Sequence, residues 1–129
     1  MDKIYNPDLK DNLIIGLTFE FAIEIVKYCE ELESKRKFVI ANQLLKSGTS
    51  IGANAREAQN AESKVDFIHK FKISSKEADE VEYWLLICKS SDNYPDCSLL
   101  LEKVIQIKKV LSKIIASSKK SLAQKSFKN

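Results

Sequence analysis

The chain contains few of the residues that interrupt helices or cross-link loops. Three glycines, two prolines and three cysteines occur among its 129 residues. So few glycines and prolines argue against a fold built from many tight turns. Cys29, Cys88 and Cys97 form no CxxC pair and are odd in number, which predicts free thiols rather than a disulfide framework. No long apolar run is present that could act as a signal segment or membrane span, so we expect a cytoplasmic protein.

Histidine is scarcer still, and this excludes several kinds of site. A di-iron bundle needs two Glu-x-x-His motifs with two further carboxylates, and a zinc site needs paired cysteines or histidines. The single histidine, His69, follows the core position Phe67 by two residues, so we expect it on the outer face of its helix. We therefore expect no catalytic residue, no metal site and no cofactor.

Apolar and small residues recur at alternating steps of four and three, the spacing of helices that pack against helices. This spacing predicts four helices, at about residues 18–33, 37–60, 64–91 and 96–119. The pattern leaves the start of the first helix open between Asp11 and Thr18, although Gly16 disfavours an early start, and Ser63 is expected to cap the third helix. We expect one all-α domain over residues 12–119, between an N-terminal extension (1–11) and a basic flexible tail (120–129).

The segment Gly48-Thr49-Ser50-Ile51-Gly52 looks like the nucleophile elbow of a serine hydrolase, but its surroundings argue against one. An elbow lies between a strand and a helix and requires a histidine and an acid from elsewhere in the fold. Here the helical spacing continues through the segment, at Ile40, Leu44, Ser47, Ile51 and Asn54. We therefore expect an uninterrupted helix in which Ser50 has no catalytic role.

Gly48, Gly52 and Asn54 are unusual residues for a helix that packs in a core. Each interior glycine costs a helix about 0.5–1 kcal/mol relative to alanine, so two in one turn predict the close approach of a neighbouring helix. Asn54 lies on the apolar stripe, where we expect it to form a hydrogen bond across the bundle and set the helix register. A ligand-binding role for Asn54 is the alternative.

Charge is unevenly distributed, although the formal net charge is only +3. Residues 1–34 carry eight acids and three bases, whereas residues 103–129 carry eight lysines and no acid. Six of these lysines lie opposite or beside the apolar seam of the last helix: Lys103, Lys108, Lys109, Lys113, Lys119 and Lys120. Such a ridge attracts phosphates and predicts nucleic-acid binding that weakens as salt rises. Alternatively, the ridge complements the acidic first helix, within one chain or between copies.

The first and third helices carry more apolar side chains than one packed stripe requires. The additional side chains that we assign to a subunit interface are Phe19, Ile23, Ile68, Tyr83 and Trp84. A monomer would expose a large apolar surface if it left them in water, so we expect copies of the chain to associate. A broad core-facing stripe with a few exposed aromatics is the alternative.

The segment Gln43–Ala58, QLLKSGTSIGANAREA, resembles the signature of a family of four-helix bundle proteins. Its founding members are encoded by intervening sequences in bacterial large-subunit ribosomal RNA (rRNA) genes. Further matching segments are FEFA from Phe19, SKVDFI from Ser63 and EYWL from Glu82. The resemblance covers roughly residues 12–118.

This resemblance implies an antiparallel up-down-up-down, left-handed four-helix bundle whose copies assemble side by side, in family members as pentamers. The accessory proteins of diversity-generating retroelements are similar in fold, and are thought to bind nucleic acid and a reverse transcriptase through a basic surface. The family pattern implies no catalytic residue.

Two hypotheses about function follow. The first is a non-enzymatic, homo-oligomeric bundle that presents its basic surface to RNA or DNA as an adaptor. The second is a protein-interaction scaffold that binds a peptide or protein and has no nucleic-acid role. Neither hypothesis involves a membrane or a cofactor.

Overall fold

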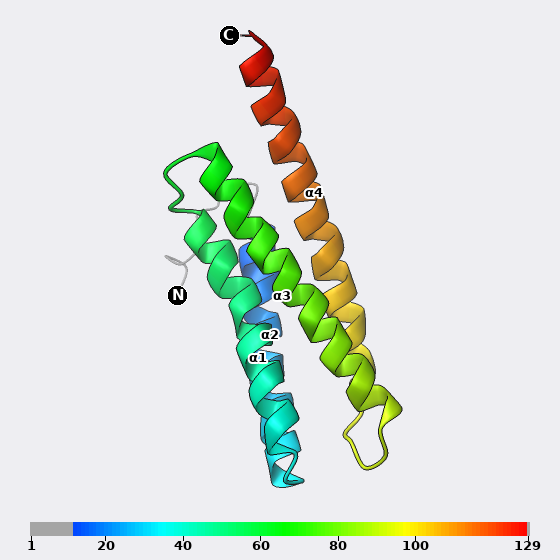
Figure 1. Cartoon of the computed structure of the whole chain (residues 1–129). Helices are drawn as coiled ribbons and strands as arrows, with labels where there is room; N and C mark the ends of the chain where they lie inside the picture. The colour runs from blue at the N-terminus through cyan, green and yellow to red at the C-terminus, as the bar shows by residue number, and fades with distance from the viewer. Residues whose placement is uncertain (1–11, 129) are drawn as a thin grey trace.

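Four α-helices make up most of the molecule (Figure 1). The structure is a computed structural model that describes residues 12–128. Over that range it contains no strand, and its helices are α1 (Asn12–Ser34), α2 (Phe38–Ala58), α3 (Lys64–Ser90) and α4 (Ser98–Lys128). The all-α prediction is confirmed. Both ends of α2 and α3 lie within two residues of their predicted positions.

The start of α1 lies near the early end of the range left open between Asp11 and Thr18, not at residue 18. The helix begins at Asn12, six residues before the predicted start, and it includes Gly16. Ile14 and Ile15 of this first part are buried in the core, and burying one such side chain contributes about 1.5–3 kcal/mol. This gain exceeds the cost of about 1 kcal/mol for one helical glycine. The predicted extension, residues 1–11, lies outside the described residues.

The end of α4 was predicted wrongly, since the helix continues past Lys119 to Lys128. No glycine or proline interrupts residues 98–128. Ser118 is buried and Leu122 is half-buried, so the inner seam of the helix extends beyond the predicted end. The segment expected to be a flexible tail is therefore helical as far as Lys128.

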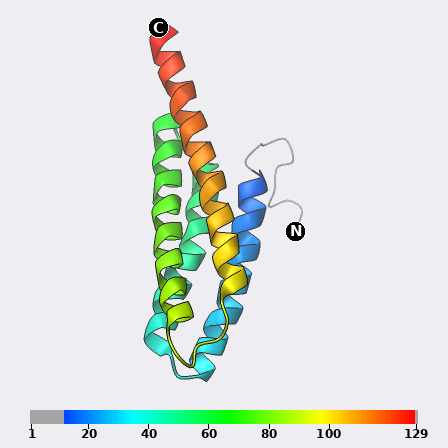
Figure 2. The same ribbon diagram turned by 90° about the vertical axis from the view of Figure 1, so that its right-hand side faces the viewer.

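Each helix contacts two others, and together the four surround one core. α1 packs on α2, α2 on α3 and α3 on α4, and a smaller contact between α1 and α4 closes the ring. Across residues 12–128 the backbones of the diagonal pairs, α1 with α3 and α2 with α4, do not come close to each other. The α1–α2 and α3–α4 connections lie at one end of the molecule, and the α2–α3 connection lies at the other (Figures 1 and 2). The last part of α4 projects beyond the other helices at that second end (Figure 2).

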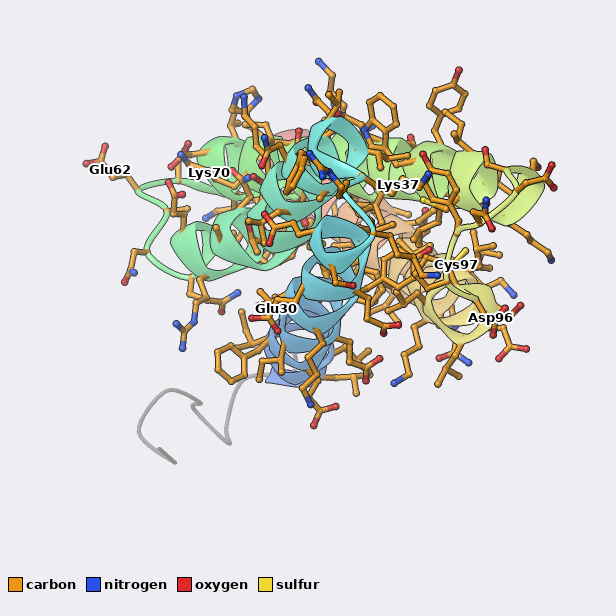
Figure 3. All side chains as sticks on the ribbon, turned by 90° about the horizontal axis from the view of Figure 1, so that it is seen from below. Glu30, Lys37, Glu62, Lys70, Asp96 and Cys97 are labelled. Carbon is orange, nitrogen blue, oxygen red and sulfur yellow. The ribbon has the colours of Figure 1, made fainter. Side chains whose placement is uncertain are left out.

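The end that carries two connections is held together by contacts between them. Figure 3 looks along the molecule from this end, where Lys37 and Cys97 are labelled. The Lys37 ammonium lies 4.9 Å from the centre of the Tyr94 ring, and the Tyr28 hydroxyl donates a 2.7 Å hydrogen bond to the Pro95 carbonyl. These contacts link the α3–α4 connection to α1 and to the start of α2.

The core is apolar, and its few polar groups are satisfied. Its largest fully buried side chains come from all four helices and include Phe21, Leu44, Phe71 and Leu111. The buried hydroxyl of Ser74 donates a 2.7 Å hydrogen bond to the Ile51 carbonyl, which joins α3 to α2. Within the described chain, no buried side-chain nitrogen or oxygen lacks a hydrogen-bond partner.

The two glycines of α2 lie against α1, as predicted. A Cβ added at Gly48 would come within 2.7 Å of Cγ2 of Ile25, and one added at Gly52 would come within 3.1 Å of the Thr18 hydroxyl oxygen. The close approach of α1 and α2 therefore depends on the missing side chains. The helix continues through Gly48–Gly52, and Ser50 donates its hydroxyl proton to the Lys46 carbonyl of the same helix.

The prediction for Asn54 was wrong. Its side chain is half-buried, and its amide donates a 2.9 Å hydrogen bond to the Ser50 carbonyl in the same helix. Toward the other described helices it forms no hydrogen bond. The hydrogen bond between α3 and α2 comes from Ser74 instead, because its position on the inner face of α3 points its hydroxyl at the α2 backbone.

Candidate nucleic-acid interface

Two of the six lysines predicted to bind nucleic acid are paired with acids in the same chain. Lys103 forms an ion pair with Glu24 of α1. Lys108 lies between two acids of α3, at 2.8 Å from Asp79 and 2.6 Å from Glu82. Hydrogen bonds to Asp79 and then Glu82 raise the pKa of Lys108 above its usual value. These two lysines therefore neutralise acids on the neighbouring helices.

The other four lysines, Lys109, Lys113, Lys119 and Lys120, are exposed. None of them forms an ion pair with any residue that the structure describes. Lys125 continues the series on the next turns of α4 and is also exposed. Lys125 was not among the six predicted lysines, because the segment from residue 120 onward was expected to be a flexible tail.

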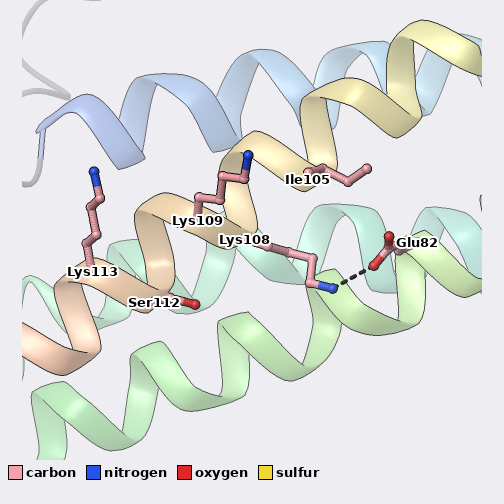
Figure 4. Close-up of a pocket in the computed structure, with 6 residues that line it drawn as sticks. All are labelled: Glu82, Ile105, Lys108, Lys109, Ser112 and Lys113. Carbon is pink, nitrogen blue, oxygen red and sulfur yellow. Dashed lines mark hydrogen bonds and ion pairs between the residues drawn. The ribbon is translucent and has the colours of Figure 1, made fainter.

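A shallow depression of about 560 Å³ lies on the outer side of α4, next to α3. It is lined by Glu82, Ile105, Lys108, Lys109, Ser112 and Lys113. Figure 4 shows that Lys108 extends toward Glu82 on α3, whereas Lys109 and Lys113 extend from the opposite side of α4. The α4 surface therefore has an internally paired side and a side whose ammonium groups are available to an anion.

The residues predicted to form a subunit interface have different environments. Ile23 and Tyr83 are exposed, with 43% and 62% of their surfaces in solvent, and Phe19 is half-buried below the Arg56 guanidinium. Trp84 is half-buried against the core, and its indole nitrogen donates a 3.2 Å hydrogen bond to Glu80. Ile68 is buried within the chain, so its assignment to an outer interface was wrong.

A groove between α1 and α2 was not predicted. It encloses about 250 Å³ and is lined mainly by small or apolar residues: Ile15, Thr18, Phe19, Ala22, Thr49, Gly52, Ala53 and Arg56. Ile23, Val26 and Leu45, which are exposed apolar residues of the same two helices, add to the apolar surface. The small residues of α2 predicted close packing against another helix. They did not predict that a groove would lie beside the helix contact.

The histidine and the cysteines, which could in principle support catalysis, lie in different environments. His69 is exposed on the outer face of α3, and the three cysteines are free and buried. Burial raises the pKa of the Cys29 thiol to about 12, which makes it a poor nucleophile. Burial also raises the pKa of Glu77, with a further contribution from Glu80. Within the described part of the chain, no group of three or more histidine, cysteine or acidic side chains could hold a metal ion.

The length and hydropathy of a helix determine whether it could span a membrane. None of the described helices combines the length and the apolar character needed to cross a bilayer. This is consistent with the charged residues on each of the four.

The profile of the 23S rRNA-intervening sequence proteins matches residues 10–113. The chain belongs to this family. A similar solved structure is that of a protein of unknown function from the S23 ribosomal protein family of Bacteroides thetaiotaomicron VPI-5482. The two proteins are 40% identical with a TM-score of 0.76, over 79% of this chain and 97% of the other. The chain has no match among curated proteins.

Membership of the 23S rRNA-intervening sequence protein family confirms the resemblance that the α2 signature suggested. Four of the six predicted lysines lie within the matched residues: Lys103, Lys108, Lys109 and Lys113. Lys119, Lys120 and Lys125 lie beyond them, on the last turns of α4. The available lysines are thus divided between the part of α4 that the family profile matches and the part beyond it.

Proposed function

We propose that this protein is a non-enzymatic, homo-oligomeric adaptor that presents the lysines of α4 to RNA or DNA. The observation that carries the proposal is a row of exposed lysines that form no ion pair within residues 12–128, Lys109, Lys113, Lys119 and Lys120. Because no acid follows Glu102 in the sequence, the positive potential along this part of α4 is not offset by acids of the same segment. A polyanion that releases its counterions on contact is the ligand that this surface favours.

In this proposal the bundle has the up-down-up-down, left-handed topology, and copies assemble side by side, with a pentamer as the expected form. Exposed Ile23 and Tyr83 and half-buried Phe19 and Trp84 contribute to the interface. Assembly would place the α4 lysines of several copies on one particle. Repeated weak contacts would then raise the overall affinity for a long nucleic acid.

Charge reversal tests the proposal. We expect Lys109→Glu/Lys113→Glu/Lys120→Glu to weaken the binding of a mixed-sequence RNA or DNA oligonucleotide by at least about ten-fold. The dependence of affinity on salt should also become shallower, by about one unit of slope for each lost phosphate contact. Fluorescence anisotropy at several salt concentrations measures both effects.

The matched control is Lys35→Glu/Lys72→Glu/Lys89→Glu, which changes the net charge by the same amount at exposed lysines elsewhere. We expect this variant to retain most of the binding. Equal losses in both variants would indicate a general charge effect, and undiminished binding in the α4 variant would refute the proposed surface.

The second candidate is a protein-interaction scaffold, and the apolar α1–α2 groove favours it. A helix or extended peptide with small apolar side chains would fit a groove of this kind. If the protein forms a defined oligomer that binds neither RNA nor DNA at low salt, this candidate replaces the first.

A further inference from the structure

The end of α4 beyond Ser118 is exposed on almost every side. Its exposed residues are Lys119, Lys120, Ser121, Ala123, Gln124 and Lys125, and only Leu122 is half-buried. With 3.6 residues per turn, these positions cover the circumference of the helix except for the side on which Leu122 lies. Figures 1 and 2 agree that this part of α4 projects away from the other three helices.

The same segment is basic and too short to form a stable helix by itself. Residues 119–128 contain four lysines and no acid. An isolated helix of this length is marginal in water, and neighbouring like charges weaken it further. Continuity with the packed part of α4 supplies the helical nucleus, and a ligand of negative charge would remove the repulsion. The segment lies outside residues 10–113, which match the family.

Polar and charged residues are arranged on this segment in a regular way. Ser117, Ser121 and Gln124 are spaced by four and three residues, so they share one face of the helix, and all three are exposed. Lys120 and Lys125 lie on either side of this polar face, because each is offset from it by part of a turn. A stripe of uncharged hydrogen-bonding groups is thus bordered by cations on both sides.

We infer that the end of α4, residues 117–128, binds in the major groove of double-stranded DNA. This inference rests on the proposed nucleic-acid function and names its ligand. A helix is about 10–12 Å across with its side chains, and the major groove of B-form DNA is about 12 Å wide. The major groove of A-form RNA is too narrow for side chains to read, and a single strand offers no groove.

The chemistry of the two kinds of residue matches the two parts of that groove. Lys120 and Lys125 reach the phosphates along the two edges, which positions the helix but does not read sequence. Ser121 and Gln124 face the base edges, where serine accepts or donates one hydrogen bond and glutamine pairs with adenine through two. The bundle holds the helix at its packed end, and Lys109 and Lys113 lie on the turns that precede it.

Ala123→Pro tests the inference, because it interrupts the helix and leaves every lysine, serine and glutamine in place. Proline lacks the amide donor and clashes with the carbonyl of residue 119, so the helix would end before the substitution. Ala123→Ser is the matched control. Anisotropy is measured for three probes of one sequence: a short DNA duplex, its single strand and the corresponding RNA duplex.

We expect the parent and Ala123→Ser to bind the DNA duplex about ten-fold or more tightly than the other two probes. Ala123→Pro should lose this preference and retain its weaker binding to the single strand. Circular dichroism should show a small loss of helix in Ala123→Pro, and light scattering should show an unchanged particle mass.

Tight duplex binding by Ala123→Pro would overturn the inference, because the helix would then be unnecessary. Equal binding of the three probes by the parent would also overturn it, while the proposed nucleic-acid function would stand. Failure of the parent to bind any probe at low salt would refute both.

Discussion

Tyr28 and three cysteines are buried at the end of the molecule that carries the α1–α2 and α3–α4 connections, where α1 packs against its neighbours. Cys29 donates a 3.4 Å hydrogen bond to the Ala41 carbonyl, and Cys97 donates a 3.2 Å hydrogen bond to the Leu85 carbonyl. Burial is the main cause of the raised pKa values of Tyr28, Cys29, Cys88 and Cys97. These groups favour the protonated, neutral form in the folded chain.

The Cys29 thiol should therefore make stability depend on pH. Its folded pKa is about 12, whereas its ordinary value is 9.0. As pH rises above 9, the unfolded chain loses this proton first, so the free energy of unfolding falls. One such thiol lowers it by about 1.4 kcal/mol per pH unit between pH 9 and the folded pKa. Below pH 9 the contribution is fully present.

Urea unfolding of the reduced protein between pH 7.5 and 10.5 measures this dependence. Cys29→Ala removes the titrating group, so its stability should decline less steeply than that of the parent above pH 9. The comparison uses slopes, since the lost sulfur also leaves a small cavity that lowers stability at every pH. Identical slopes for the two proteins would contradict the expected effect of Cys29.

At the scale of the elements, α1 and α2 pack closely because α2 presents glycine to the side chains of α1. The position of a Cβ at Gly48 is occupied by buried Ile25, whose branched side chain has few ways to move. Gly16 of α1 differs, because no non-local atom lies within 4 Å of its added Cβ. Substitution by alanine should therefore change stability in opposite directions at Gly48 and at Gly16.

We expect Gly48→Ala to lower the free energy of unfolding by about 1–3 kcal/mol, because overpacking outweighs the better helix propensity of alanine. Gly16→Ala should raise it by about 0.5–1 kcal/mol, since only the propensity gain remains. Chemical denaturation of the two variants and the parent measures both changes. A Gly48→Ala protein as stable as the parent would show that α1 shifts away at little cost.

At the scale of the whole molecule, a single chain leaves several large apolar side chains exposed. Exposed Ile23, Val26 and Leu45 belong to the two helices that also form the α1–α2 groove. Trp84 is a less suitable probe, because its half-buried ring packs against the core of its own chain. Ile23 can be changed with little effect on folding.

If copies associate through this surface, Ile23→Glu should give smaller particles with the same helical content, since a desolvated charge is costly in an interface. Val65→Glu, at a residue with 62% exposure at the start of α3, should leave the particle mass unchanged. Size-exclusion chromatography with light scattering measures the mass. An Ile23→Glu particle of parental mass would exclude Ile23 from the interface.

The helical pattern of this protein is determined locally, and so it could be predicted from the sequence. The four-three spacing specified α2 and α3 to within two residues, and the Ser63 hydroxyl accepts the Asp66 amide proton, as expected of a capping residue. Gly48 and Gly52 were recognised because a helical glycine is costly unless a neighbour needs the space. The signature in α2 led directly to the family.

Only the tertiary structure decided which lysine side chains of α4 remain available to an anion. Lys103 and Lys108 form ion pairs, unlike Lys109, because acids of α1 and α3 lie within their reach. Which lysines face those acids depends on how each helix is rotated in the bundle, and residue spacing along one helix does not determine that rotation. Burial of Ile68 and the early start of α1 likewise depend on neighbouring helices. The sequence determined the elements and the excess of lysine, because both are local or compositional. Which lysines stay exposed depends on the fold, because ion pairing and burial involve residues that are far apart in the sequence.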